Sequence, residues 1–234
     1  MREPLRVAVA QPPTVAYDVV ANVATHAETV RRAAARLVVF PELSVTGYEL
    51  DAPTIGADDP RLAPIVDACA ETGALALVGA PLRGADGRAH IGLVAVTGTG
   101  ARVAYHKMWL GGEESGRFAP GDRPGVLEVG GWRLGLAVCK DTGVARHAAD
   151  TAARGIDVYV AATLEHAEEA TVQDERSRRI ASEHRVWVAV ASFAGSTGGG
   201  FDRAAGRSAI WRPDGTAVAR AGPEVGAIVR GTLR

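Results

Sequence analysis

Three side chains in this sequence could together carry out a thiol-dependent hydrolysis: Glu42, Lys107 and Cys139. Each follows an apolar run that is typical of a buried strand, so we expect each at a strand end. A cysteine held by a rigid strand can act as a nucleophile. A carboxylate can accept its proton, and an ammonium can stabilise the negative charge that develops on the substrate. Any one of these residues alone would more often be structural, so the inference depends on all three.

The two cysteines differ in their surroundings. The apolar run Leu134–Val138 ends at Cys139, at the point where the chain must turn. Cys69 instead lies on the apolar face of a helix predicted over residues 59–72, so we expect it in the core. Two cysteines cannot form a disulfide framework, and they fit a reducing cytoplasm.

A glycine-rich loop follows Lys107, which ends a strand predicted over residues 101–106. This loop shows little periodicity, and a long loop of this kind is often functional. Its aromatic side chains, Trp109 and Phe118, are expected to need burial.

Predicted strands and helices alternate along the chain in the manner of an α/β layered fold. The repeated strand–helix–strand rhythm occurs in both halves, without a linker or low-complexity tract, so we expect a single domain over residues 1–234. Helices are predicted over residues 18–36, 59–72, 144–154 and 165–185. Strands are predicted over residues 5–11, 36–40, 74–81, 90–96, 101–106, 131–139, 156–161, 186–192, 208–211, 216–221 and 225–233.

Composition excludes several classes of function. The net charge of −1 argues against an extended nucleic-acid surface, and no apolar run reaches membrane-spanning length. The N-terminal stretch has no apolar segment of signal-peptide length. Neither a metal-ligand spacing nor a nucleotide-binding glycine motif is found, and the GxSxG motif of serine hydrolases is missing. We therefore expect no metal, no cofactor, no nucleic-acid partner and no membrane.

The histidines offer little support for a Cys–His pair. His106 precedes Lys107 on one strand, so the two side chains should point to opposite faces. A pairing of Cys139 with His147 or His184 stays open at this stage.

Four stretches, in order, resemble the nitrilase superfamily of carbon–nitrogen hydrolases. They are VAVAQ…LVVFPELSVTGY, YHKMWL, GLAVCKD and RRIASEHRVWVAVAS…GRSAIWRPDGTAVA, and together they span about residues 5–233. Each motif is weak alone, but Glu, Lys and Cys in this order at three strand ends form a strong joint signal.

The resemblance implies a four-layer α-β-β-α sandwich with a Glu–Lys–Cys triad and no cofactor. By position, Glu42 matches the general base, Lys107 the cationic stabiliser and Cys139 the nucleophile. A second glutamate in the loop after the lysine assists in many members; Glu114 matches it best and Glu113 is the alternative. The family also tends to form homodimers.

Two departures from the family pattern lie near the expected pocket. Lys140 stands where an aromatic residue is common after the cysteine, and Trp109 lies in a run that differs from the usual His-Leu-Phe. Both residues are candidates for substrate contacts, and Lys140 could select an acidic substrate or simply face solvent.

The reaction expected first is hydrolysis of a small non-peptide C–N bond (amide, ω-amide or N-carbamoyl) through a thioester. Nitrile hydrolysis, acyl transfer to an amine, and a non-catalytic member of the fold are the alternatives. All four catalytic candidates are present, which argues against the last.

Overall fold

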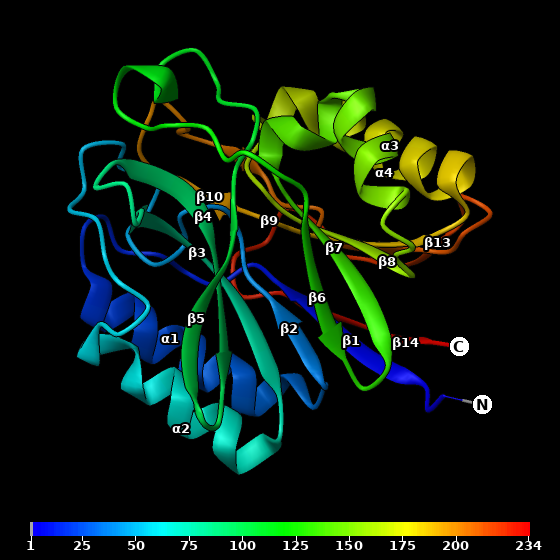
Figure 1. Cartoon of the computed structure of the whole chain (residues 1–234), viewed down its shortest axis with the longest axis horizontal. Coiled ribbons are helices and arrows are strands. Elements are labelled where there is room, and N and C mark those ends of the chain that lie inside the picture. The colour runs from blue at the N-terminus through cyan, green and yellow to red at the C-terminus, as the bar shows by residue number, and fades with distance from the viewer. Residues whose placement is uncertain (1) are drawn as a thin grey trace.

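The computed structural model describes residues 2–234 and is a four-layer α-β-β-α sandwich (Figure 1). Two six-stranded sheets pack face to face. The first has the order β14-β1-β2-β3-β4-β5, with β1 at Leu5–Ala10, β2 at Leu37–Val39, β3 at Leu75–Arg83, β4 at Ala89–Thr97, β5 at Gly100–His106 and β14 at Ile228–Leu233. The second has the order β13-β12-β9-β8-β7-β6, with β6 at Gly125–Val129, β7 at Trp132–Val138, β8 at Val158–Thr163, β9 at Trp187–Ser192, β12 at Ala209–Trp211 and β13 at Ala217–Arg220.

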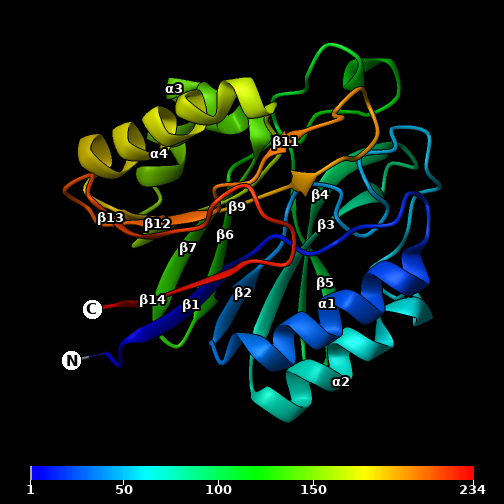
Figure 2. The same cartoon turned by 180° about the vertical axis from the view of Figure 1, so that it is seen from behind.

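Each sheet contains three parallel strands joined by helical crossovers. Strands β1, β2 and β3 are parallel, and so are β7, β8 and β9. The crossover helices α1 (Val19–Ala33) and α2 (Ala63–Thr72) cover the outer face of the first sheet. Helices α3 (Ala145–Ala152) and α4 (Ala170–His184) cover the second, as Figure 2 shows from behind. Parallel strands end at the same edge of a sheet, which is where α/β proteins build their sites.

Side chains alternate between the two faces of each strand, so the core has three layers: one between the sheets and one beneath each pair of helices. In β1, Val7 and Val9 face the other sheet, whereas Ala8 packs beneath the helices. In β8, Val160 faces the first sheet and Tyr159 packs beneath α3 and α4. Since successive strand residues point to opposite faces, a continuous apolar run is what a strand buried on both sides requires.

Most predicted elements are confirmed, with three corrections. The helix predicted from residue 165 begins at Ala170, after a 3-10 turn at Ala167–Glu169, because the backbone of residues 165–167 first hydrogen-bonds to residues 203–205. Strand β6 lies between the predicted loop and the predicted strand over residues 131–139, in a stretch for which no element was predicted. Trp109 is 38% exposed, so the expectation that it needs burial was wrong, while Phe118 is buried as expected.

Shorter elements complete the chain. The two-residue strands β10 (Ala194–Gly195) and β11 (Ala204–Ala205) pair with each other, and 3-10 turns lie at Pro60–Leu62, Glu114–Gly116 and Cys139–Gly143. Within residues 2–234, no helix has both the length and the apolar character that crossing a bilayer requires.

Candidate active site

A buried ammonium lies between two buried carboxylates at the ends of the strands. Lys107 Nζ donates to Glu42 Oε1 at 2.7 Å and to Glu114 Oε1 at 2.6 Å. The three residues are at most 2% exposed. An ammonium has three donors, so one N–H of Lys107 stays available after these two bonds. The structure thus joins residues that are far apart in the sequence into one charged cluster.

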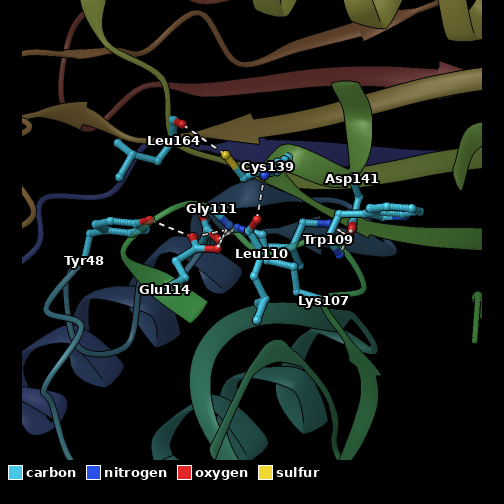
Figure 3. Close-up of polar contacts among 12 residues, drawn as sticks. Tyr48, Lys107, Trp109, Leu110, Gly111, Glu114, Cys139, Asp141 and Leu164 are labelled. Atoms are coloured by element: carbon cyan, nitrogen blue, oxygen red, sulfur yellow. Dashed lines mark hydrogen bonds and ion pairs between the residues drawn. The ribbon is translucent and has the colours of Figure 1, made fainter. Parts of the chain in front are cut away.

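Glu114 is the second glutamate of this cluster. It accepts hydrogen bonds from Tyr48 Oη at 2.6 Å and from the Gly111 amide at 2.5 Å (Figure 3). Glu113, the alternative, is exposed at the surface of the same loop. The contact with Lys107 therefore belongs to Glu114.

Cys139 opens the 3-10 turn Cys139–Gly143 directly after β7. Its φ is +41°, a left-handed conformation that non-glycine residues adopt rarely and that is often found at functional sites. The sulfur lies 3.3 Å from the carbonyl oxygen of Leu164, to which the thiol donates, and the residue is partly exposed. The amides at the start of such a turn have no partner within it, so the Lys140 N–H can serve as a donor.

The Glu42 turn rests on a position that must be glycine. Leu43 has a φ of +51°, and a Cβ placed on Gly79 of β3 would lie 2.3 Å from the Pro41 carbonyl oxygen. No larger residue fits there without moving the backbone that carries Glu42. The strand β3 therefore supports the turn from below.

Backbone bonds on both sides hold Lys107 in place. Its amide donates to the Ile91 carbonyl and its own carbonyl accepts from Gly121 N–H, each at 2.8 Å. Lys107 thus lies where the glycine-rich loop departs from and returns to the first sheet.

Asp141 connects the turn after Cys139 to the loop after Lys107. The carboxylate accepts from Val138 N–H at 2.9 Å, from Trp109 N–H at 2.9 Å and from Tyr105 Oη at 2.7 Å. Asp141 is fully buried. One carboxylate therefore sets the position of the turn that carries Cys139 relative to the loop.

The two carboxyls beside Lys107 differ in proton affinity. Burial raises the pKa of Glu42 to about 7, although the charge of Lys107 opposes this effect. Burial acts on Glu114 in the same direction, but there the Lys107 charge and hydrogen bond prevail and lower the pKa. Moreover, Glu42 Oε2 is buried and has no hydrogen-bond partner within the described residues. A carboxyl with this pKa and a free oxygen suits proton transfer near neutral pH.

The thiol and the ammonium keep their protons in the resting site. Burial and the charge of Glu42 raise the pKa of Cys139 well above its usual value, against the charge of Lys107. For Lys107, burial alone would lower the pKa, but the neighbouring acidic groups outweigh it and raise the pKa. A raised thiol pKa favours the protonated form, and a thiol becomes a nucleophile only when a base takes its proton.

The two substrate-contact candidates lie beside this cluster rather than in it. Lys140 is exposed, and its Nζ donates to the Leu110 carbonyl at 2.7 Å. The ring of Trp109 points away from Glu114 and Cys139 in Figure 3. Their substrate contacts stay predictions.

No histidine pairs with Cys139 in the described part of the chain. The ring of His106 stacks on His90 with centroids 4.2 Å apart. His147 bonds to the hydroxyls of Tyr105 and Tyr159, and His184 is the last residue of α4. No hydrogen bond among residues 2–234 joins an imidazole to the sulfur of Cys139.

Four contributors were not recognised from sequence: Tyr48, Asp141, the Leu164 carbonyl and Glu165. Tyr48 and Asp141 lie inside the stretches that suggested the resemblance, so their proximity to the catalytic candidates was a usable signal. Glu165 was assigned to a helix start, which concealed it. Among residues 2–234, no group of three or more His, Cys, Asp or Glu side chains is arranged to hold a metal ion.

Comparison with solved structures places this fold among known ones. A CN-hydrolase superfamily protein of Xanthomonas campestris superposes with a TM-score of 0.88 at 22% identity, covering 99% of this chain and 91% of that one. An amidase from Nesterenkonia sp. gives a TM-score of 0.87 at 25% identity, with 98% and 90% covered. Nit3 of Saccharomyces cerevisiae, a nitrilase-superfamily member, gives 0.86 at 20% identity, with 99% and 90% covered.

Sequence comparison agrees with the structural one. A Pseudomonas protegens protein described as a hydrolase in the pqqF 5′ region is 30% identical over 98% of this chain and 82% of its own length. The pattern of the carbon-nitrogen hydrolase family matches residues 6–232. With this match over nearly the whole length, and with the fold to support it, the chain belongs to the carbon-nitrogen hydrolase family.

Proposed function

We propose that this enzyme hydrolyses small non-peptide amides, ω-amides or N-carbamoyl compounds through a thioester on Cys139. Glu42 is the general base, Lys107 stabilises the developing negative charge, and Glu114 holds Lys107 in place. The observation that carries the proposal is the position of Lys107 Nζ, 2.7 Å from Glu42 and 2.6 Å from Glu114, with one donor left over.

In the first step, the Cys139 sulfur attacks the amide carbon and Glu42 accepts the thiol proton on its free oxygen, Oε2. Negative charge develops on the amide oxygen, where the remaining N–H of Lys107 and the backbone N–H of Lys140 can donate. A preorganised donor of this kind is worth about 3–4 kcal/mol in the transition state. The tetrahedral intermediate collapses when Glu42 returns the proton to the departing nitrogen.

In the second step, ammonia or an amine has left and Cys139 carries the acyl group as a thioester. Glu42 then accepts a proton from water, whose oxygen attacks the thioester carbon and releases the acid. The thiolate regains its proton from Glu42, so no other group is consumed.

The Nesterenkonia amidase supports this choice of reaction. Mutants of that protein were solved with butyramide bound and with the acetamide moiety of fluoroacetamide added to the active-site cysteine. A small primary amide is therefore the first substrate class to test on this chain, ahead of nitriles.

The test is ammonia release from a panel of small amides, ureido acids and nitriles, by the wild type and by Cys139→Ala. We expect Cys139→Ala to lose at least about a thousandfold in kcat, because the nucleophile is gone, while its circular dichroism and melting temperature stay close to the wild type. Mass spectrometry with a slow substrate should show an acyl group on Cys139.

Cys69 provides the matched control. It is buried in α2, with its thiol 3.5 Å from the Val96 carbonyl, remote from the triad. Cys69→Ala should keep its turnover number. An acyl group on Cys69, or undiminished turnover by Cys139→Ala, would refute the proposed mechanism.

A further inference from the structure

A further carboxylate, besides Glu42, Glu114 and Asp141, lies near Cys139 and has no part in the mechanism above. The Cys139 thiol donates to the carbonyl of Leu164, and Glu165 is the next residue along the loop that follows β8. Glu165 is only 7% exposed. A nearly buried carboxylate is costly unless something satisfies it, so its presence beside the sulfur calls for a reason.

Only one of its two oxygens is occupied. Oε1 accepts from Arg176 Nη1 of α4 at 2.5 Å, whereas no hydrogen bond from residues 2–234 reaches Oε2. The guanidinium of Arg176 in turn lies against the nucleophile turn, since its Cζ would be 3.3 Å from a Cβ built on Gly143. Arg176 therefore anchors the carboxylate from one side and leaves its second oxygen free.

The charge of Glu165 acts within the catalytic site. Burial and the charge of Glu42 are the larger causes that raise the pKa of Cys139, the charge of Lys107 opposes them, and the charge of Glu165 raises this pKa further. Burial raises the pKa of Glu165 itself, against the opposing charges of Arg176 and Lys107. These pKa shifts agree with the hydrogen bond from the Cys139 thiol to Leu164, the residue directly before Glu165.

Aromatic side chains border the same place. Leu164 forms an apolar cluster with Phe193 and Ala204, against which Tyr48 and Phe201 pack. The rings of Tyr48 and Phe201 meet edge to face with centroids 5.3 Å apart. Tyr48 also bonds to Glu114, so this aromatic wall continues directly into the catalytic cluster.

We propose that Glu165 is a specificity-determining residue, whose free oxygen recognises a protonated amine carried by the amide substrate. A carboxylate oxygen binds an ammonium group by charge-assisted hydrogen bonding, and the aromatic rings that pack against the neighbouring Leu164 can add attraction to the cation. The same carboxylate repels a substrate that carries a negative group at this place. The assignment of a substrate class rests on the proposed amidase function, but the electrostatic selection at Cys139 does not.

The first experiment measures that selection without turnover. Cys139 is labelled with three methanethiosulfonates that differ only in charge: aminoethyl (cationic), methyl (neutral) and sulfonatoethyl (anionic), and peptide mass spectrometry reads the rate at Cys139 alone. Rates are divided by those for free cysteine. We expect the wild type to favour the cationic reagent over the anionic one, and Glu165→Gln to reduce that ratio about tenfold.

Three comparisons make the result specific. The neutral reagent reports any change in thiol reactivity that affects all reagents equally, such as the lower thiol pKa expected once the Glu165 charge is removed. Glu165→Asp keeps the charge and should keep the preference for the cation. Glu175→Gln removes an exposed carboxylate from α4 and should leave the ratio unchanged.

The second experiment uses substrates. Ammonia release is compared for 4-aminobutanamide, pentanamide and succinamate, and Glu165→Gln should lose its preference for the first through a rise in KM rather than a fall in kcat, because recognition of the amine is what is removed. Equal labelling ratios in the wild type and Glu165→Gln would overturn the inference. A changed labelling ratio without turnover of any amide would instead leave the inference standing and count against the proposed function.

Discussion

The pKa values of the two glutamates that contact Lys107 shift in opposite directions, because the surroundings of the two carboxyls differ. Glu114 has partners on both oxygens, from Lys107, Tyr48 and Gly111, and these stabilise its charged form. Glu42 has an unpartnered buried oxygen, and burial raises its pKa to about 7. Hydrogen bonds to a carboxylate lower its pKa and desolvation raises it, so one residue type supplies both a permanent anion and a proton acceptor.

The pH dependence of activity should follow from this difference. Glu42 must be ionised to accept the thiol proton, so kcat/KM should rise as the pH increases through about 7, the value to which burial raises the Glu42 pKa. Activity is thus present above this pKa and is lost as the carboxyl takes up a proton below it. The measurement is kcat/KM for a neutral amide between about pH 5 and pH 9.

A control for this profile is the Glu42→Gln variant, which has no group to titrate. Its residual activity should be lower by about a hundredfold or more and should lack the rise near neutral pH. A wild-type profile that is flat from acid to neutral pH and rises only in the range of a cysteine thiol would show that the titrating group is Cys139, and would contradict the assignment to Glu42.

At the scale of elements, one buried carboxylate joins three parts of the chain. Asp141 receives three hydrogen bonds, from the end of β7, from the loop after Lys107 and from Tyr105 of β5. The same hydroxyl of Tyr105 contacts His147 of α3. Polar contacts of Asp141, two residues after Cys139, therefore connect the two sheets.

Asp141→Asn should loosen this connection. An amide has only one acceptor atom, so at least one donor of Val138, Trp109 or Tyr105 would lose its partner, at a cost of about 1–3 kcal/mol in the free energy of unfolding. We also expect a lower kcat, because the carboxylate that hydrogen-bonds to both the turn and the loop is lost. Denaturant unfolding and steady-state kinetics measure both effects.

Asp150→Asn is the matched control, because this aspartate of α3 makes only an exposed ion pair with Arg146, at 3.4 Å. Its free energy of unfolding should change by no more than about 0.5 kcal/mol. If Asp141→Asn behaves in the same way as this control, Asp141 does not position the site.

The turn that carries Glu42 depends on a glycine in a neighbouring strand. A Cβ on Gly79 would come within 2.5 Å of the Leu43 nitrogen as well as the Pro41 oxygen, and both atoms are backbone. Gly79→Ala should therefore displace Glu42. We expect the free energy of unfolding to fall by about 1–3 kcal/mol, and the loss of activity to come more from a lower kcat than from a higher KM.

Gly116→Ala serves as the comparison for this substitution. Gly116 has no atom within 4 Å of an added Cβ, and its φ is not in the left-handed region. We expect near wild-type kcat for this variant. Full activity of Gly79→Ala would show that the turn does not need this support.

At the scale of the whole molecule, the layered architecture was predictable because its signal is strong. Buried strands such as β3 and β8 are continuous apolar runs, and the helices between them show an apolar stripe. Order along the chain then places Glu42 and Cys139 at the ends of parallel strands in different sheets. Periodicity could not predict that the two sheets pack face to face. That expectation came from the family resemblance.

Other features could not be predicted because tertiary contacts decide them. The loop around Glu165 is charged and has the pattern of a helix start, yet the ion pair with Arg176 and the backbone hydrogen bonds to residues 203–205 keep it out of α4. Trp109 looked like a residue in need of burial, but Asp141 holds its backbone amide and leaves the ring at the surface. The choice of Glu114 over Glu113 likewise needed the position of Lys107.

The expected homodimer stays a prediction. Sedimentation or light scattering of the purified protein would establish the number of chains in the assembly.

The pairing of the first and last strands has a consequence for how this chain can be rebuilt. Leu5 of β1 lies opposite Leu233 of β14, so the two ends of the described chain are neighbours at one end of the sandwich (Figure 1). A short glycine-serine linker could close the polypeptide into a ring, which could then be reopened in the exposed turn between Asp86 and Gly87. We expect this circular permutant to fold and to keep kcat within about threefold of the parent, as assayed by ammonia release, because every strand keeps its neighbours. A permutant that folds but loses kcat would mean that the β3–β4 connection, far along the chain from Cys139, contributes to the geometry of the triad.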